Sequence, residues 1–430
     1  MIIIARILLL ISRLVIRRYQ PKIIGITGSV GKTSAKEAIC AVLTSRFRVR
    51  HSVKSYNNEI GVPLTIIGCE SANRSMLGWL KIFFFGMKLG FFKDKNYPEM
   101  LVLEMGADRP GDIASLISLA PSDIGVLTAI APTHLEKFLT MENVAAEKRL
   151  IVTRLRRGGV AIINADDELT SKTEVPGGVT AFSYGFKEGA KVRGSDLIIS
   201  NDLVSGKAVV RGLSFKISYA GSSVPILLRG VVGKPSTMAA LAACAVGLHY
   251  GMNLIDIGRA LQDVIWPPGR LRLIQGINNT LIIDDSYNSS PRAALTAIET
   301  FISVPLAGSA RRCVVLGDML ELGDYSEAGH IEVGQRLTEG GVDVIITVGE
   351  RARAICRAAR LGGFDPASLY CFSETSEAVK FLRDFLRSDD AVLVKGSQAM
   401  RLERVVKEIM LEPERAPELL VRQGSEWQRA

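Results

Sequence analysis

The sequence has little of the chemistry that would place it in several large protein classes. It has only four histidines among 430 residues, and its six cysteines lie far apart with no CxxC pair. This pattern is typical of reduced thiols and argues against a disulfide framework or a zinc site. The glycines follow no fixed period, which excludes collagen. No run of 18 or more apolar residues free of charge is present to make a secure transmembrane span.

The remaining composition is that of a globular protein. Hydrophobic residues make up 47% and charged residues 23% of the chain, which excludes disorder throughout. At about 150 residues per domain, the length predicts two or three domains. The net charge of +9 is modest for this length. Charge alone therefore gives no reason to expect nucleic acid as a partner, and we expect none.

The first twenty residues, MIIIARILLLISRLVIRRYQ, are apolar and basic. Their charges are at the wrong end for a signal peptide, and no small-residue cleavage site follows. In a helix, Arg6, Arg13 and Arg17 would fall near one face. The roughly 15 residues between Ile2 and Ile16 would span about 22 Å, short of the ~30 Å hydrocarbon core. We expect residues 1–18 to contact the membrane interface; the alternative is a helix that packs on the protein or on a partner.

A second apolar stretch covers residues 76–92 and carries Trp79, Lys81 and Lys88 among its aromatic residues. It is compatible with a second interfacial patch and with a lid on the substrate side. The sequence does not decide between them.

From residue 21 onward, short apolar runs alternate with helical patterns. Alternating strands and helices predict parallel sheets with helices on both faces. Short β-like pieces between 190 and 232 predict a small antiparallel extension, and Pro267–Gly269 marks the approach to a domain boundary. The main predicted strands cover residues 23–27, 100–104, 124–128, 160–164, 280–284, 313–316, 344–348 and 391–394.

Residues 27–34, TGSVGKTS, lie between a predicted strand and a predicted helix. In such a loop, glycines let backbone N–H groups approach phosphate oxygens, and the helix N-terminus adds its positive dipole. Lys32 is expected to reach the β- and γ-phosphates, and the Thr33 hydroxyl to hold Mg²⁺. Ile26 replaces the first glycine of the usual motif, but the strand–loop–helix context is kept. The predicted nucleotide-binding residues are Gly28, Ser29, Gly31, Lys32, Thr33 and Ser34.

Three single residues are weaker candidates. Glu104 closes an apolar run and would offer a carboxylate at a strand end, whereas a solvated strand terminus is the ordinary alternative. His134 lies just past another strand as a candidate metal ligand, against the alternative of a hydrogen-bonded loop histidine. Lys148 lies on a predicted helix, where a surface lysine is the default. These residues become informative only in combination.

In combination with further motifs they form a recognisable series. Lys148 lies fourteen residues after His134, and the series resembles the Mur ligase family in order and spacing. Later stretches look like the C-terminal domain of its MurF type, and the resemblance covers roughly residues 21–410. The motifs are NNEIGVP at 57–63, EMGA at 104–107, HLE at 134–136, DDSYNSSP at 284–291, LGDMLELG at 316–323 with His330, and VKGS at 394–397.

The resemblance implies a cytoplasmic, ATP-dependent ligase that forms an amide through an acyl phosphate. For the MurF type, it implies addition of D-alanyl-D-alanine to UDP-N-acetylmuramoyl-tripeptide in peptidoglycan synthesis. It further implies that Thr33 and Glu104 hold one Mg²⁺ and that His134 holds a second. Lys148 would be carbamylated by CO₂, becoming an anionic ligand that helps place the magnesium. Lys32, His134, Lys148 and Arg270 would then be the catalytic residues.

The resemblance assigns roles to the later motifs as well. Arg270 matches the arginine that reaches the γ-phosphate, and its planar fork suits a transferring phosphoryl group. Asp285 matches the acid that holds the ribose, and Tyr287 and Asn288 belong to the same substrate-binding loop. The alternatives are a junction arginine in an ion pair and an aspartate that caps a turn. Residues 57–58 (Asn57 and Asn58) are expected to shape the loop near the phosphates and the sugar nucleotide.

Two departures from the family are visible. MurF proteins carry an N-terminal domain that grips the UDP-sugar, and here only the apolar segment precedes the first strand. Recognition of the UDP end is therefore expected from elsewhere, such as residues 70–100, or the acceptor differs. The family pattern GxHNxxNALAA is replaced by GKPSTMAAL at 233–241, which alters the expected adenine contacts.

We therefore predict an α/β protein with a central P-loop domain over residues 21–275, built on a mostly parallel sheet. A C-terminal Rossmann-like domain over 276–412 and a polar, peripheral tail over 413–430 follow, with ATP in the cleft between the domains. The leading function is the MurF-type ligase, and we expect this ligase to contact the inner face of the membrane through residues 1–18. The alternatives are a related ligase with another amine and a different, lipid-linked acceptor, and a non-catalytic nucleotide-binding scaffold.

Overall fold

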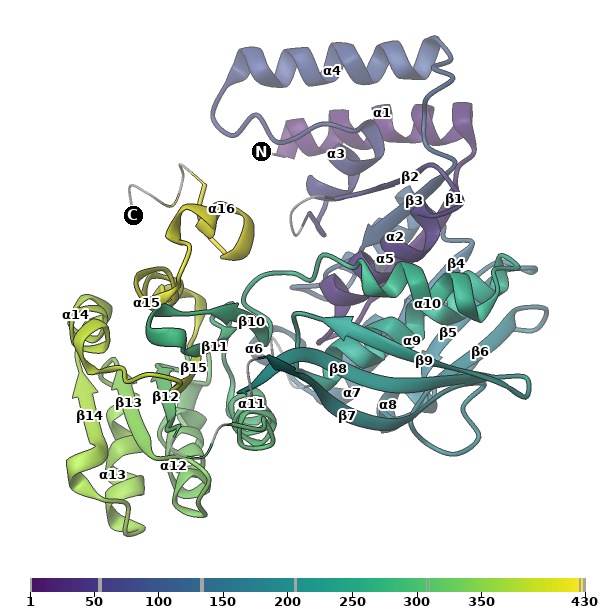
Figure 1. Ribbon diagram of the computed structural model, residues 1–430. Coiled ribbons are helices and arrows are strands. Elements are labelled where there is room, and N and C mark those ends of the chain that lie inside the picture. The colour runs from purple at the N-terminus through teal and green to yellow at the C-terminus, as the bar shows by residue number, and fades with distance from the viewer. Residues whose placement is uncertain are drawn as a thin grey trace. The chain divides into compact units, whose positions relative to one another are not determined.

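In the computed structural model the chain forms two compact units (Figure 1). The first contains Met1–Leu197, Ser214–Leu228 and Lys234–Ile265, and the second contains Ile198–Leu213, Arg229–Gly233 and Trp266–Ala430. The structure describes residues 2–52, 56–131, 135–204, 207–306, 308, 310–424 and 427, with the backbone alone at 2, 135, 136, 203, 204, 207 and 208. The domain limits at residues 20, 275 and 412 stay predictions.

A nine-stranded sheet runs through the first unit in the order β2-β3-β1-β4-β5-β6-β7-β8-β9. The pairs from β2 to β7 for which a register is defined are parallel, and Ile26 on β1 lies opposite Glu104 on β3. Parallel pairing brings the carboxyl ends of β1, β3 and β4 to one edge. The strands are β1 (Lys22–Thr27), β2 (Val49–His51), β3 (Met100–Glu104), β4 (Ile124–Leu127), β5 (Val160–Asn164), β6 (Thr180–Gly185), β7 (Val192–Val204), β8 (Lys207–Tyr219) and β9 (Ser222–Arg229).

Helices cover both faces of this sheet, as the alternation of strands and helices predicted. On one face α2 packs against α9, which in turn contacts β5 and β6. On the other, apolar residues of α5 and α7 join the main core with those of β1, β3 and β4. The helices are α2 (Lys32–Thr44), α5 (Asp112–Leu119), α6 (Leu135–Phe138), α7 (Met141–Thr153), α8 (Glu168–Ser171), α9 (Lys234–His249) and α10 (Leu254–Gln262).

Three further helices of the first unit form a separate layer: α1 (Ile2–Tyr19), α3 (Gly61–Ile67) and α4 (Met76–Phe91). Helix α1 lies between α3 and α4 and contacts both (Figure 1). Its buried residues Leu8, Ile11 and Val15 belong to the main apolar core. The predicted helix over the first twenty residues is thus confirmed, and it packs on the protein itself.

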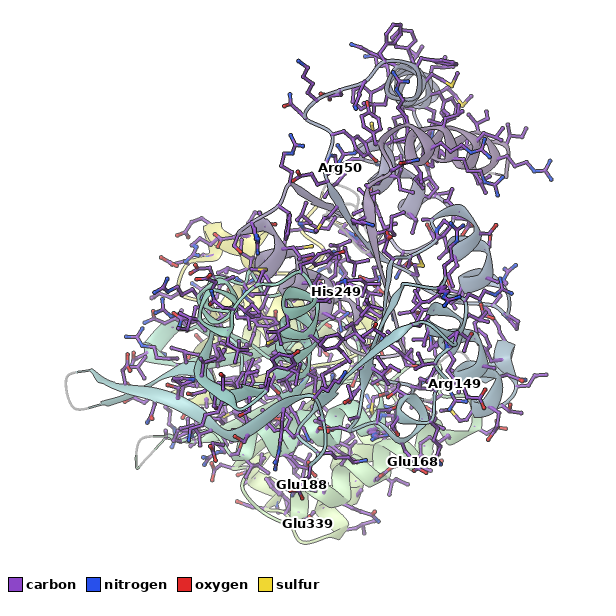
Figure 2. The ribbon with its side chains drawn as sticks, turned by 90° about the vertical axis from the view of Figure 1, so that its right-hand side faces the viewer. Arg50, Arg149, Glu168, Glu188, His249 and Glu339 are labelled. Atoms are coloured by element: carbon purple, nitrogen blue, oxygen red, sulfur yellow. The ribbon has the colours of Figure 1, made fainter. Side chains whose placement is uncertain are left out.

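A cation and two aromatic rings hold this layer to the sheet. The guanidinium of Arg50, labelled in Figure 2, donates to the carbonyl oxygen of Ile66 at 2.9 Å. Its Cζ atom also lies 4.9 Å from the centre of the Tyr97 ring. Tyr97 stacks on Tyr19 at 3.9 Å between ring centres, which joins the end of α1 to the segment before β3.

The second unit contains a six-stranded sheet in the order β10-β11-β15-β12-β13-β14. Strand β10 is antiparallel to β11, and all other neighbours are parallel. The predicted C-terminal strands are confirmed within one or two residues. The strands are β10 (Arg272–Gln275), β11 (Leu281–Asp285), β12 (Arg312–Gly317), β13 (Val344–Val348), β14 (Leu369–Phe372) and β15 (Ala391–Lys395).

Helices again lie on both faces, since separate apolar cores form on the two sides of this sheet. One core holds residues of α11, α12 and α13, and the other holds residues of α14, α15 and α16. The longer helices are α11 (Pro291–Ile302), α12 (Ser326–Thr338), α13 (Arg353–Leu361), α14 (Thr375–Phe385), α15 (Glu403–Ile409) and α16 (Ala416–Leu419), and short 3₁₀ turns cover Ile277–Asn279, Gly323–Tyr325, Pro366–Ser368, Gln398–Met400 and Pro413–Arg415.

The expectation that the tail over residues 413–430 is peripheral is wrong for Ala416, Leu420 and Val421, which are buried. Ala416 and Leu420 are buried in the second core of this unit. The Arg422 guanidinium donates to the carbonyl oxygen of Ser286 at 2.7 Å and pairs with Glu403 at 3.0 Å. The polar composition of the tail concealed the few apolar residues that anchor it.

Candidate functional site

The loop between β1 and α2 has the backbone conformation that its glycines allow. Gly28 has φ 151° and Gly31 has φ 87°, the left-handed region that side-chain-bearing residues rarely adopt. A Cβ atom at Gly28 would also overlap the Thr128 hydroxyl at the end of β4. Both glycines are therefore needed for the chain to turn sharply into α2.

The same loop is tied to the neighbouring strand ends by hydrogen bonds. The Ser29 amide donates to the Ala129 carbonyl oxygen at 2.6 Å. The Thr128 hydroxyl donates to the Val30 carbonyl oxygen at 2.7 Å, and the Thr27 hydroxyl donates to that of Met105 at 2.7 Å. These bonds engage the Ser29 amide and the Val30 carbonyl oxygen of the loop, and so fix the loop's shape ahead of any ligand.

Lys32 is the first residue of α2, and its ammonium folds back across the loop. The Nζ atom donates to the Gly28 carbonyl oxygen at 2.7 Å. Together with the helix N-terminus, this ammonium gives the loop a positive potential suited to phosphate. Thr33 and Ser34 follow on the first turn of the same helix, and Ser34 is buried.

Glu104 ends β3 next to this loop, and its carboxylate is almost fully buried, with 2% of the residue exposed. Its Oε1 atom accepts a hydrogen bond from the Asn57 amide at 3.1 Å. Among the described residues, no donor lies within hydrogen-bonding distance of Oε2. A buried, ionised oxygen without a partner is costly, so its position indicates a cationic ligand.

Lys148 lies on α7 and is buried, with 3% exposed, instead of lying at the surface. Burial and, to a smaller extent, the nearby Lys32 ammonium lower the pKa of Lys148 to about 8, against the opposing charges of Glu147 and Asp108. The neighbouring Glu147 carboxylate accepts hydrogen bonds from the amides of Gly111 and Ile113, at the start of α5. The structure thus gives Glu147 a capping role and leaves Lys148 as the buried amine near the loop.

The two asparagines of the 57–63 motif separate in role. The Asn57 side chain contacts Glu104, as described above, whereas the Asn58 carboxamide oxygen accepts from the amides of Ile60 and Gly61 and caps α3. The Asn57 side chain therefore lies at Glu104, and the Asn58 side chain does not. His134, the predicted ligand of a second magnesium, lies outside the described residues.

The side chains at this edge fit a magnesium ion better than a transition metal. Among the described residues, no group of three histidine, cysteine, aspartate or glutamate side chains gathers as a metal cluster. A hard oxygen from Glu104 and the hydroxyl of Thr33 are of the kind that Mg²⁺ accepts alongside water and substrate phosphates. The unpartnered Oε2 of Glu104 is the observation that supports this fit.

In the second unit, Asp285 and Lys395 end adjacent parallel strands and lie opposite each other in register. Their side chains form an ion pair of 2.7 Å, and Lys395 also donates to the Asn288 carbonyl oxygen at 2.9 Å. Burial raises the pKa of Asp285, against the opposing charges of Lys395 and Arg270. The sequence interpretation gave Asp285 a role in the site but quoted Lys395 only as part of the motif VKGS, although a polar residue after an apolar strand marks both positions.

The turn that carries Arg270 is fixed by the residue before Asp285. The amide of Gly269, which has φ 69°, donates to the buried Asp284 carboxylate at 3.1 Å. The guanidinium of Arg270 then lies over the Tyr287 ring, with Cζ 4.3 Å from the ring centre. Arg270, Tyr287 and Asp285 are thereby brought together, as their assignment to one site requires.

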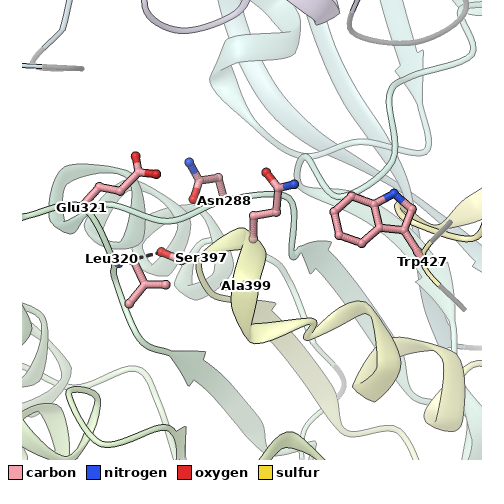
Figure 3. A pocket seen from close by; sticks show the side chains of 7 residues that line it. Asn288, Leu320, Glu321, Ser397, Ala399 and Trp427 are labelled. Atoms are coloured by element: carbon pink, nitrogen blue, oxygen red, sulfur yellow. Dashed lines mark hydrogen bonds between the residues drawn. The ribbon is translucent and has the colours of Figure 1, made fainter. Parts of the chain in front are cut away.

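A pocket of about 300 Å³ lies in the second unit close to this loop (Figure 3). The Ser397 hydroxyl accepts a hydrogen bond from the Leu320 amide at 2.8 Å and so joins two of its walls. Asn288 and Glu321 place polar side chains at its rim in Figure 3. The lining residues are Asn288, Leu320, Glu321, Ser397, Gln398, Ala399 and Trp427.

The altered stretch 233–241 forms the start of α9. Lys234 begins the helix, and its ammonium lies 5.5 Å from the centre of the Phe186 ring. Ser236 and Thr237 are buried. The helix itself is therefore kept although the amide side chains of the family pattern are absent.

Comparison with known proteins places these sites in context. Residues 86–247 match the model of the Mur ligase middle domain, and residues 269–398 match that of the Mur ligase glutamate ligase domain. The chain is 29% identical to the UDP-N-acetylmuramoyl-tripeptide–D-alanyl-D-alanine ligase of Bacillus subtilis over 397 residues, covering 91% of this chain and 76% of that protein. The equivalent Escherichia coli ligase is 29% identical over 396 residues, covering 91% and 78%. The crystal structure of the MurF ligase from Thermotoga maritima in complex with ADP is 27% identical with a TM-score of 0.74, covering 96% of this chain and 84% of that one.

Proposed function

The chain belongs to the Mur ligase family, and from this premise we propose that it adds D-alanyl-D-alanine to UDP-N-acetylmuramoyl-tripeptide at the expense of ATP. The proposal is supported by the relatives that carry this name and by the ADP complex of one of them. The observation in this chain that carries it is the buried Glu104 oxygen, which has no partner among the described residues and lies beside a phosphate-type loop. A protein that bound no magnesium nucleotide would have no use for such a costly group.

In this proposal the first unit binds the triphosphate and its magnesium. Residues 28–34 hold the phosphates through backbone amides and the Lys32 ammonium. Thr33 and Glu104 would hold one Mg²⁺, and His134 would hold a second. When bound, the ions neutralise charge on the phosphate oxygens.

Lys148 is proposed to act as a carbamate. The ammonium would first lose one proton. The neutral Nζ atom would then attack the carbon of CO₂, an N–C bond would form as one C=O π bond opens, and a second proton would be released, so that a cation becomes an anion over the two steps. Its burial near Lys32 supports this, since burial and a neighbouring cation both disfavour the ammonium and favour the neutral amine that reacts with CO₂. The anion would help to orient the magnesium.

The second unit is proposed to hold the rest of the nucleotide and the substrates. Arg270 would contact the γ-phosphate, with its guanidinium held flat by Tyr287. Asp285 would accept hydrogen bonds from the ribose while Lys395 keeps it ionised. Tyr287, Asn288, Asn57 and Asn58 are proposed substrate-side residues, and for Asn58 this role would fall to the backbone, because its side chain caps α3.

The chemistry consists of two balanced steps. The acceptor carboxylate attacks the γ-phosphorus, an O–P bond forms, and ADP leaves with the electrons of the broken P–O bond. The amine of the dipeptide then attacks the acyl carbon, loses a proton and expels inorganic phosphate. The first step depends mainly on positioning and on charge neutralisation, for which Lys32 and Arg270 are suited.

The test is ATP-dependent ligation by the purified full chain. Muramyl tripeptide nucleotides with lysine or diaminopimelate at the third position are offered together with D-alanyl-D-alanine, and phosphate release and the product mass are measured. We expect one phosphate per pentapeptide formed. Absence of both signals with each acceptor, beside an active control ligase, would refute the proposal.

A second candidate is a ligase of the same family that acts on a lipid-linked acceptor or with another amine. It is favoured by the exposed apolar residues of α4, because a lipid-linked acceptor is met at a membrane. Phosphate release with a lipid-linked muramyl peptide, and none with the UDP-linked one, would select it.

We also propose that the protein works in the cytoplasm and contacts the inner face of the membrane through residues 1–18. Among the described residues, no helix combines the length and apolar character needed to cross a bilayer. Contact would therefore be peripheral. The exposed Arg6, Arg13 and Arg17 of α1 support it, because they would lie at the level of lipid headgroups.

A further inference from the structure

Helix α4 has two apolar faces, and only one of them is used in the core. The first carries Trp79, Ile82 and Leu89, which are buried in the main core of the first unit. The backbones of α1 and α4 approach closely on this side, since a Cβ atom at Gly86 would lie 2.5 Å from Ile11 Cγ2. Gly90 faces Leu14 in the same way, four residues further on. This packing orients α4 and leaves its opposite face outward.

The outward face carries a second apolar stripe. Its members recur at spacings of three and four residues, which places them along one side of a helix. Phe84 is 76% exposed and Leu77 is 74% exposed, although large apolar side chains are usually buried. The stripe comprises Leu77, Leu80, Phe84, Met87 and Phe91.

The stripe lies on the outside of the layer that α1, α3 and α4 form. In Figure 1, α4 is the outermost of the three helices, with α1 between it and α3. Figure 2, turned by 90°, shows side chains projecting outward from this layer. Phe92, at the end of the helix, is 69% exposed and continues the same apolar surface.

The charged residues of the two helices themselves all have one sign. Helices α1 and α4 contain no acidic residue. Lys81 and Lys88 are exposed on α4, seven residues apart and hence on one side of the stripe. The exposed surface of α1 adds Arg6, Arg13 and Arg17, interspersed with Ile3 and Leu10.

We infer that this surface, formed by the outward faces of α4 and α1, docks on the headgroup–acyl boundary of a bilayer that contains anionic phospholipid. The inference deepens the membrane part of the proposed function and makes α4 the principal contact. At about 24 Å for 16 residues, α4 is too short to span the hydrocarbon core but suits a helix lying in the interface plane. Exposed cations without acids fit anionic headgroups, whereas the centre of a protein interface is usually depleted of lysine.

Vesicle flotation with the full chain tests the inference. The probes are two kinds of vesicle, one of phosphatidylcholine alone and one of phosphatidylcholine prepared with about 30% phosphatidylglycerol. We expect binding to the anionic vesicles, weaker binding to the neutral ones, and weakening of the anionic signal at high salt. Absence of binding to anionic vesicles at low salt would overturn the inference.

Two double variants locate the contact. Leu80→Ser with Phe84→Ser removes exposed apolar groups and should reduce binding at least about 30-fold. Lys81→Ala with Lys88→Ala should reduce it about tenfold or more, with little left of its salt dependence. The matched control is Leu361→Ser, which removes an 89% exposed leucine of the second unit and should leave binding unchanged.

Three other results would contradict the inference. Undiminished vesicle binding by both variants would mean that α4 is not the contact. A dimer that Leu80→Ser with Phe84→Ser dissociates, with no vesicle binding, would show that a second copy covers the face. Capture of a protein partner that competes with vesicles for the stripe, without lipid binding by the free chain, would assign the face to that partner.

The outcome is separable from that of the ligase proposal. Both readouts are taken on the unmodified chain: phosphate release with water-soluble substrates for the ligase, and vesicle flotation for the docking surface. An inactive but vesicle-binding protein would refute the ligase alone, and an active protein that ignores vesicles would refute the docking surface alone.

Discussion

Glu104 and Asp285 hold corresponding positions in the two units but have opposite surroundings. Each is an acid at the carboxyl end of a parallel strand in its own sheet. Asp285 has a lysine at 2.7 Å from the neighbouring strand. Glu104 has one hydrogen bond from Asn57, and its other oxygen has no partner among the described residues.

Asp285 has a partner within the fold, whereas the partner of Glu104 is expected to be a bound ligand. A buried ion pair satisfies both of its members, so removing either one leaves an uncompensated charge. An unpartnered carboxylate oxygen weakens the fold until a cation binds. Mutation should therefore reduce stability at Asp285 and activity at Glu104.

The largest effect is expected for Glu104→Gln. The amide keeps the size and the contact with Asn57 but loses the charge that a magnesium ion needs, so turnover should fall at least about 10³-fold. The thermal midpoint should stay unchanged or rise, because an ionised buried oxygen is removed. Phosphate-release kinetics and calorimetry measure the two quantities.

Glu142→Gln, at an exposed position on the first turn of α7, serves as the control and should change neither quantity by much. A Glu104→Gln protein that is active but less stable would contradict the comparison, because Glu104 would then contribute to stability as Asp285 does.

The next largest effect is expected for Lys148→Ala, at about 10²–10³-fold in turnover. If a carbamate is the working group, a short-chain carboxylic acid added to the variant should occupy the vacated space and restore part of the activity. Lys172→Ala, at an exposed lysine paired with Glu168, is the control and should behave like the unmodified chain. Unchanged turnover in Lys148→Ala would remove Lys148 from the site.

A smaller effect is expected for Lys395→Met, and it concerns the stability of the fold as well as turnover. The change leaves Asp285 buried without its cation and should lower the free energy of unfolding by roughly 3 kcal/mol. Combining it with Asp285→Leu should restore much of that loss, since no buried charge then remains. Urea unfolding of the two single variants and the double variant measures the coupling. Additive losses would show that the pair contributes no interaction energy.

Local sequence signals predicted the loop of the first of these two sites. The turn from β1 into α2 is specified by adjacent residues, since Gly28 and Gly31 supply the conformation and Lys32 starts the helix. The strand end at Glu104 was equally readable. The missing partner of the Glu104 Oε2 atom could not be predicted, because it depends on side chains distant in sequence and on whether they reach this oxygen in the fold.

The second site depends on contacts that are distant in sequence. Lys395 and Asp285 are 110 residues apart, and only the order of the strands makes them neighbours. A polar residue after each of two apolar strands was a usable signal for this pair. No comparable signal existed for Arg422, whose contact with Ser286 depends on the few apolar residues that bury the tail.

The N-terminal helix shows the limit of composition. An apolar helix with three arginines fits both a membrane interface and a protein core, and α1 supplies buried residues to the core while it exposes the arginines. Deleting residues 1–18 would therefore uncover the inner faces of α3 and α4 and destabilise the layer. Loss of membrane association after that deletion would not by itself identify the contact, which is why substitutions on the outer face of α4 are the sharper test.

The smallest effect expected concerns Asp284, the buried acid next to Asp285, which has backbone donors but no lysine. Its carboxylate accepts from the amides of Gly269 and Ser286, both at 3.1 Å, and burial raises its pKa to about 6. Between its ordinary pKa of 3.8 and about 6, the folded protein keeps a proton that the unfolded chain has released, so this group makes stability fall as pH rises. Asp284→Asn should remove that contribution, and its stability relative to the unmodified chain should increase by roughly 2–3 kcal/mol between pH 4 and pH 7. Urea unfolding at each pH, with the exposed Asp324→Asn as control, measures the difference. A constant difference across this range would mean that Asp284 keeps an ordinary pKa, because its two backbone donors offset the effect of burial.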